Sequence, residues 1–130
     1  MAEHTFRITR IYSDDKGESH FEKRLIPLEQ AGEIGSLSPL LPGKGVIFRE
    51  VPAGYDYDFH TAPRRQYIIL LDGEIEIETS LGEKRRFRGG EILLVEDTTG
   101  KGHKTRNLKK ETRRSLFIPL DDADNGVKNE

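Results

Sequence analysis

Residues 54–73 have the sequence GYDYDFHTAPRRQYIILLDG, and this stretch decides the fold. It predicts one strand that ends near His60, a turn at Ala62-Pro63, and a second strand that begins at Gln66. Side chains two apart on a strand share a face, so His60 and Ala62 point the same way. Gln66 begins the neighbouring strand and can point toward the same side. We therefore expect His60 and Gln66 to line one pocket.

A second polar cluster, GHKTRN at residues 102–107, supplies the missing side of that pocket through His103. On a strand, Thr105 and Asn107 share the face of His103, whereas Lys104 and Arg106 point away. The predicted ligand pocket therefore consists of four residues, which are His60, Gln66, His103 and Asn107.

Short strands separated by turns account for the rest of the chain, and no convincing helix is present. Residues 29–44 are interrupted by glycine and proline, so we expect a loop there with at most one helical turn near 28–32. This pattern is typical of an all-β sandwich or barrel. The other predicted strands are 6–12, 19–28, 45–51, 67–71, 74–79, 84–88, 91–95, 103–107 and 113–120.

The basic run KRRFR at residues 84–88 follows an acidic strand and a three-residue turn, Ser80-Leu81-Gly82. This hairpin register places each acidic side chain opposite a basic one, and such pairs contribute roughly 0.2–1 kcal/mol each. We therefore interpret the run as a solvated sheet face and not as a nucleic-acid patch. The predicted pairs are Glu74 with Arg88, Glu76 with Arg86 and Glu78 with Lys84.

The chain has 130 residues, which is the size of one domain, and its formal net charge is only −2. That charge argues against nucleic-acid or membrane-surface binding. The chain has no cysteine, so any metal would have to be bound by histidine, carboxylate or amide groups. No signal pattern begins the chain, and no apolar run approaches the roughly 18 residues of a membrane span. We expect a cytoplasmic protein.

The central stretch resembles the first motif of the cupin superfamily. In words, this motif is glycine, five residues, His-x-His, three or four residues, glutamate, six residues, glycine. Here Gly54 is followed after five residues by His60-x-Ala62, after three more by Gln66, and after six more by Gly73. Every spacing fits, but Ala62 stands in place of the second histidine and Gln66 in place of the glutamate.

The second cupin motif is similar to the residues from Gly90 onward. The end of that motif fits Gly100-x-x-His103-x-x-x-Asn107, whereas Thr98 stands where the motif has proline. Two residues more than usual separate Gly90 from this end. The resemblance covers roughly residues 45–120.

The resemblance implies a double-stranded β-helix, or jelly-roll barrel, with a pocket that opens between its two sheets. We divide the single domain, residues 1–130, into an N-terminal hairpin at 5–28, a barrel core at about 45–120 and a polar tail at 121–130. Small one-domain cupins are commonly dimers in which N-terminal strands join the partner's sheet. A homodimer is therefore expected, with the first hairpin as the candidate for that exchange.

Cupins that bind metal usually use two histidines and a carboxylate from the first motif and one histidine from the second. The resemblance therefore implies a site for a divalent metal (Fe, Mn, Ni or Zn) on His60, Gln66 and His103. Loss of an imidazole and replacement of a carboxylate by an amide both weaken such a site. Asp58 shares the face of His60 if the strand is unbroken, so it is a candidate for the missing carboxylate.

Other side chains near the motif receive simpler interpretations. Arg64 and Arg65 lie in the turn between the two motif strands and could attract a carboxylate or phosphate at the rim. An aromatic stripe opposite His60 is expected to form core or dimer interface. Its members are Tyr55, Tyr57 and Phe59.

Three hypotheses about function remain open. The first is a metal-binding enzyme of the dioxygenase or isomerase kind that acts on a small molecule. The second is a metal-independent protein without catalytic activity that binds a small ligand as a sensor, carrier or stress-related accessory protein. In any metal-free pocket, His60 and His103 could act as acid and base in an isomerisation, epimerisation or lyase step, or could orient a ligand. The third is a structural role like that of storage cupins, which predicts a filled barrel without an open pocket.

Overall fold

The structure is a computed structural model, and it describes residues 4–120. Strands make up just over half of these residues and are connected by turns and loops. The strands are β1 (Thr5–Ser13), β2 (Ser19–Pro27), β3 (Glu29–Gln30), β4 (Ser36–Leu37), β5 (Ile47–Val51), β6 (Asp56–His60), β7 (Gln66–Leu70), β8 (Glu74–Thr79), β9 (Lys84–Arg88), β10 (Ile92–Glu96), β11 (His103–Asn107) and β12 (Arg113–Pro119).

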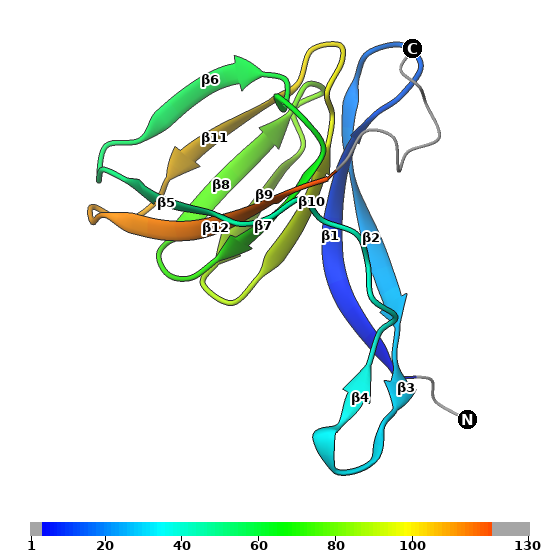
Figure 1. Ribbon diagram of the computed structural model, residues 1–130. Helices are drawn as coiled ribbons and strands as arrows, with labels where there is room; N and C mark the ends of the chain where they lie inside the picture. The colour runs from blue at the N-terminus through cyan, green and yellow to red at the C-terminus, as the bar shows by residue number, and fades with distance from the viewer. Residues whose placement is uncertain (1–3, 121–130) are drawn as a thin grey trace.

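Two facing sheets form a barrel of the jelly-roll type (Figure 1). The larger sheet has the order β2-β1-β10-β7-β12-β5, and the smaller has the order β6-β11-β8-β9. The predicted strands are confirmed, with ends that differ by one or two residues. No helix within residues 4–120 has the length and apolar character needed to cross a membrane.

The segment between the first hairpin and the barrel is more ordered than its glycines and prolines predict. Strands β3 and β4 pair with each other, and a 3-10 turn, Gly32–Ile34, connects them. Together with the adjoining end of the β1–β2 hairpin, they project from the barrel (Figure 1). We call this projection the arm. The predicted polar tail, residues 121–130, lies outside the described residues.

The apolar core fills part of the space between the sheets. Residues from both sheets contribute to it, including Ile11 of β1 and Phe21 of β2 in the first hairpin. Because these side chains are almost fully removed from water, burial of each one larger than alanine stabilises the fold by on the order of 1.5–3 kcal/mol. The main cluster consists of Ile11, Phe21, Ala62, Leu70, Ile75, Ile77, Phe87, Leu93 and Val95.

The β8–β9 hairpin has the predicted register, so each glutamate of β8 faces a basic residue of β9. The ion pair at Glu76 differs from the prediction, however. Arg106 of β11 contacts Glu76 at 2.9 Å, because β8 lies between β9 and β11 and Glu76 has a cation on both sides. This polar face is the solvated surface that the sequence indicates.

Candidate functional site

A cavity of about 300 Å³ opens between the two sheets. Its volume is at the lower end of the range usual for small-molecule sites. Aliphatic side chains of the core form its inner wall. Its polar lining comes from Arg49, His60, Gln66, His103, Thr105 and Arg113, and its aromatic lining from Tyr55, Tyr57 and Phe117.

His60 lies at the end of β6, and its ring is fixed from two sides. Its Nδ1 donates a hydrogen bond of 2.8 Å to the backbone carbonyl of Asp58. Its ring stacks on Tyr57 with centroids 4.0 Å apart. Burial, and to a smaller extent the nearby His103 and Arg49, lower the pKa of His60 below its usual range. The imidazole is therefore neutral at pH 7, with Nε2 as the nitrogen available to a ligand.

A β-bulge in β6 changes which side chains face the cavity. His103 pairs with His60, and Thr105 pairs with Tyr57. A step of three residues on β6 therefore lies opposite a step of two residues on β11, which means that β6 carries one extra residue. Tyr57 therefore shares the face of His60, and Tyr55 lines the same cavity, so the predicted position of these two rings on the opposite face is wrong. The same shift explains why Asp58 is not part of the pocket lining. Its carboxylate accepts a hydrogen bond from the backbone amide of Phe59 instead.

His103 begins β11, and its ring lies close to that of His60, with centroids 4.8 Å apart. Its Nδ1 donates to Oδ2 of Asp97 at 2.6 Å, and both side chains are buried. Oδ1 of Asp97 has no hydrogen-bond partner within residues 4–120. In the neutral form of the ring, this pairing again leaves Nε2 as the nitrogen that can accept a hydrogen bond from a ligand. Sequence reasoning missed Asp97, whose one signal is its place six residues before His103 in a glycine-rich loop.

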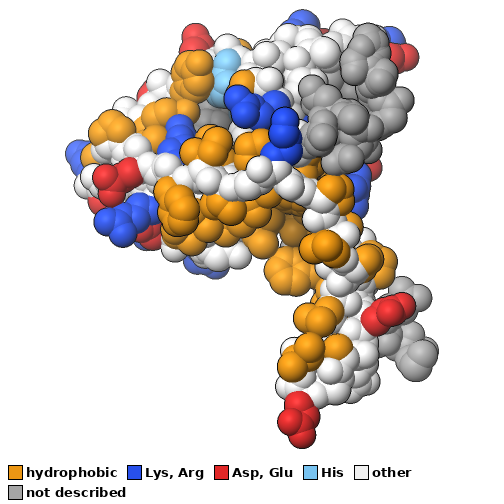
Figure 2. All heavy atoms as spheres, viewed as in Figure 1, with side chains coloured by type: hydrophobic (Ala, Val, Ile, Leu, Met, Phe, Trp, Pro, Cys, Tyr) orange, Lys and Arg blue, Asp and Glu red, His pale blue; other side chains and the backbone are white. Residues whose placement is uncertain are grey.

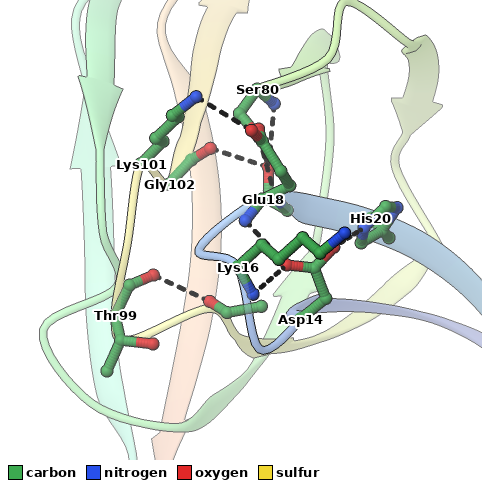
Figure 3. A network of polar contacts seen from close by, with 10 residues as sticks. Asp14, Lys16, Glu18, His20, Ser80, Thr99, Lys101 and Gly102 are labelled. Carbon is green, nitrogen blue, oxygen red and sulfur yellow. Dashed lines mark hydrogen bonds and ion pairs between the residues drawn. The ribbon is translucent and has the colours of Figure 1, made fainter.

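The loop from Asp97 to Gly102 is held by the turn of the first hairpin (Figure 3). Three hydrogen bonds cross this contact: Ser13 Oγ to the Thr99 carbonyl at 2.8 Å, the Lys101 amide to the Gly17 carbonyl at 2.9 Å, and Ser19 Oγ to the Gly102 carbonyl at 2.7 Å. Lys101 and Glu18 add an ion pair of 2.8 Å. The hairpin thus supports the loop that carries Asp97.

Gly102 brings this loop against the strand that carries His60. A Cβ on Gly102 would lie 1.9 Å from the His60 carbonyl oxygen, and the φ of Gly102 is +74°. Both facts exclude a side chain here, because the contact is with backbone and the conformation is left-handed. The glycine therefore permits the close approach of His60 and His103.

Gln66 and Asn107 have different places relative to the cavity. Gln66 is buried and lines it, as does Ala62, which stands where the motif has its second histidine. Asn107 is not among the lining residues. Its amide nitrogen donates to the Pro52 carbonyl at 3.1 Å, and its Oδ1 accepts from Nε of Arg113 at 2.8 Å. Asn107 thus acts on the cavity through Arg113.

Two arginines that sequence reasoning missed line the cavity, Arg49 from β5 and Arg113 from β12. Arg113 is two residues before Ser115 and four before Phe117, so all three share one face of β12. This spacing could have identified the inner face of the strand. Of the two arginines predicted at the rim, Arg64 and Arg65, the second has another role, because Arg65 donates from Nε to Glu96 at 2.7 Å. Glu96 also binds Arg10, so Arg65 is already neutralised within the fold.

The donor set does not fit the divalent metal that the cupin resemblance implies. Within residues 4–120, no group of three or more histidine, aspartate, glutamate or cysteine side chains is arranged to hold a metal ion. Gln66 would add only a neutral amide oxygen to the two imidazoles, and the charged groups that line the cavity are cationic. Asp97 is paired with the far side of the His103 ring. Such a site lacks an anionic ligand to offset the charge of a metal.

Comparison with known proteins shows similarity in structure alone. No protein-family model matches the chain, and no curated protein matches it. Its fold is similar to that of the cupin domain of Schizosaccharomyces pombe Cnp3, at 15% identity and a TM-score of 0.50 over 96% of this chain and 90% of that one. A cupin-superfamily sugar phosphate isomerase of Silicibacter pomeroyi aligns at 15% identity over 92% and 72% of the two chains, with a TM-score of 0.48.

Proposed function

We propose that this chain, a small cupin-like protein with an all-β barrel, binds a small molecule between its two sheets without a metal cofactor. The observation that carries this proposal is the state of the two histidines. Both Nδ1 atoms are engaged by the protein, and the two rings lie 4.8 Å apart at one cavity. Both Nε2 atoms can then accept hydrogen bonds from a ligand.

The open cavity argues against a purely structural role. A storage-type barrel is expected to be filled by side chains, whereas this one retains about 300 Å³. Aliphatic walls with a few polar groups at defined positions are typical of ligand sites. Recognition at the histidine end would rely on hydroxyl or amino groups of the ligand as donors.

A fragment screen by NMR tests this function. Phenol, catechol and 4-hydroxybenzamide are added to protein prepared without a histidine tag and kept in EDTA. We expect backbone amides of Thr61, His103 and Thr105 to shift. His60→Phe removes the acceptor nitrogen but keeps a ring on Tyr57, so binding should weaken. His4→Phe, at an exposed histidine outside the cavity, is the matched control and should bind as the wild type does.

Two outcomes would contradict the proposal. Binding that appears only after iron, manganese, nickel or zinc is added, and that EDTA reverses, would establish the weak metal site on His60, Gln66 and His103. Absence of shifts with every fragment, with and without metal, would favour the structural hypothesis.

Proton transfer of the isomerase kind is a second candidate, favoured by the buried pair of Asp97 and His103. An imidazole whose Nδ1 is held by a carboxylate has Nε2 oriented as a proton acceptor. For a ligand identified by the screen, wild-type protein in D2O should exchange a carbon-bound hydrogen for deuterium. His103→Gln should abolish the exchange, and a ligand that is bound but never exchanges would restrict the function to binding.

We also propose a homodimer that forms through the outer face of the larger sheet. Hydrophobic side chains gather along one side of the barrel and on the arm (Figure 2). Between arm and barrel lies an apolar groove of about 250 Å³, lined by Phe6, Ile26, Tyr67 and Ile69 among others. Phe6 remains 47% exposed. A second copy of the chain would cover these side chains.

A further inference from the structure

We propose that the ligand of this pocket is a small organic carboxylate, bound by Arg113 and Arg49 at the end of the cavity opposite the histidines. This inference rests on the proposed function and adds the class of ligand. It follows from two guanidinium groups that line one cavity whose lining contains no aspartate or glutamate.

Arg113 is buried, with only 3% of its surface exposed, yet it forms no ion pair within residues 4–120. Asn107 holds its Nε, which leaves the two Nη groups without a hydrogen-bond acceptor among the described residues. The side-chain stem packs against Gly73, where a Cβ would lie 3.0 Å from Arg113 Cγ and Cδ. The guanidinium is thus fixed in place with its terminal donors uncommitted.

Arg49 reaches the same region from the neighbouring strand. Its guanidinium carbon lies 5.0 Å from the centre of the Tyr55 ring and 5.1 Å from that of Phe117. Arg113 also faces Tyr55, at 5.7 Å. The two cations therefore share one aromatic neighbour, and aromatic contacts within about 6 Å stabilise a cation without neutralising it.

Two like charges beside one cavity are unfavourable unless an anion joins them. Arg49 and Arg113 are both cationic and line the same cavity, so they repel each other. The pKa of Arg113 is lowered by burial first and by the charge of Arg49 next. Asp72 is the carboxylate whose charge favours Arg113, but its Oδ1 accepts from the Arg114 amide at 2.7 Å. A ligand carboxylate would remove the repulsion and accept two parallel hydrogen bonds from a guanidinium.

The two ends of the cavity specify different parts of the ligand. Asn107, which holds Arg113, lies four residues beyond His103 on β11, or about 13 Å along the strand. Tyr55 and Tyr57 lie between the two ends and contact each other, with ring centroids 6.1 Å apart. A planar body with a carboxylate at one end and a hydroxyl at the other would match both ends.

Titration calorimetry in EDTA tests the inference with 4-hydroxybenzoate and its neutral analogue 4-hydroxybenzamide. We expect wild-type protein to bind the carboxylate at least about tenfold more tightly than the amide, because hydrogen bonds between charged groups are about twice as strong as neutral ones. Arg49→Gln and Arg113→Gln should each remove most of this difference. Arg114→Gln, at the exposed neighbour of Arg113, is the matched control and should retain it.

Buried Arg113 also contributes to the fold, so circular dichroism and thermal unfolding accompany each variant. Arg49 is only half-buried, so Arg49→Gln should fold even if Arg113→Gln does not. Arg49→Gln alone can then decide the test. Equal binding of carboxylate and amide, unchanged in Arg49→Gln, would overturn the carboxylate inference and leave the metal-free pocket in place. Tighter binding of phenyl phosphate than of 4-hydroxybenzoate would also overturn it, in favour of a phosphate ligand. Binding of neither class in EDTA would overturn the proposed function as well.

Discussion

The imidazole of His60 stacks on the ring of Tyr57 at a centroid distance of 4.0 Å and an angle of 23°, although the two residues are three apart on one strand. In a regular strand they would point to opposite faces. The bulge in β6 adds the extra residue that brings them together. As a result, aromatic rings form a continuous wall from the arginines to the histidines.

Replacement of Tyr57 should change the protonation of His60. Burial is the largest cause of the lowered pKa of His60, and Tyr57→Ala would expose the ring to water, so the pKa should rise toward its usual value. Phe59→Ala, on the other face of the strand, should leave this pKa unchanged. Titration of the His60 ring protons by NMR gives both values, and equal shifts in the two variants would show that the stack is not the cause.

The same lowered pKa predicts how stability depends on pH. Between the folded pKa and the unfolded pKa of about 6.5, the unfolded chain binds more protons at His60 than the folded protein does. The free energy of unfolding should therefore fall as the pH drops below about 6.5. Urea denaturation at several pH values should show a shallower fall for Tyr57→Ala than for the wild type.

Asp97→Asn should allow the neutral ring of His103 to adopt both of its tautomers. A carboxylate can only accept, so it fixes the proton on Nδ1, whereas an asparagine amide can either donate or accept. We expect long-range proton–nitrogen spectra to show one tautomer in the wild type and a mixture in the variant. A single unchanged tautomer in Asp97→Asn would mean that another group orients the ring.

Gly102→Ala should destabilise the protein by more than its backbone conformation alone requires. Gly82 has a comparable positive φ of 95°, but nothing lies within 4 Å of its added Cβ. Gly82→Ala should therefore cost only about 1–2 kcal/mol, whereas Gly102→Ala adds a clash with the His60 carbonyl. The difference between the two variants in urea denaturation measures that clash, and equal losses would show that the loop can move away.

The Asp14 carboxylate should titrate far below its ordinary range. The hydrogen bond from His20 and those from the Glu18 and Lys16 amides lower its pKa to about 2 (Figure 3). Its contribution to stability is therefore present above pH 3.8 and is lost as the pH falls through about 2. His20→Gln should move the midpoint upward, as followed by NMR of the carboxyl carbon, and an unchanged midpoint would assign the shift to the backbone amides.

Phe6→Glu should shift the protein toward monomers, because it places a charge in the apolar groove. Leu81→Glu is the matched control, since Leu81 is 66% exposed on the β8–β9 turn of the other sheet. Light scattering after gel filtration gives the mass of each variant. A wild-type protein that is monomeric at high concentration would contradict the proposed dimer.

Most of the fold could be predicted because alternation, turn residues and motif spacing agree in this chain. The residues around His60 show the limit of that reasoning. Parity holds only for an unbroken ladder, so one bulge transferred Tyr57 into the cavity and excluded Asp58. A bulge without a glycine in the strand leaves no clear trace in a single sequence.

The partners of the site residues were also beyond prediction. Asp97 contacts His103 and Arg113 contacts Asn107 across only six residues of chain each, but both Asp97 and Arg113 lie outside the motif positions, so neither motif points to them. The turn position of Arg65 predicts a place at the rim, and its ion pair escapes that prediction because the partner Glu96 is 31 residues away in the chain. Long-range pairs of this kind depend on strand order, which the sequence pattern alone does not determine.

Strand β1 is inserted between β2 and β10, so the first hairpin is part of the barrel wall and not an attachment to it. Its turn also supports the loop that carries Asp97. A chain shortened to residues 45–120 would therefore lose both the edge of the larger sheet and the support beneath the buried aspartate–histidine pair. The smallest unit that can carry an intact pocket must therefore include β1, whose first residue, Thr5, lies 49 residues before Gly54 of the first motif.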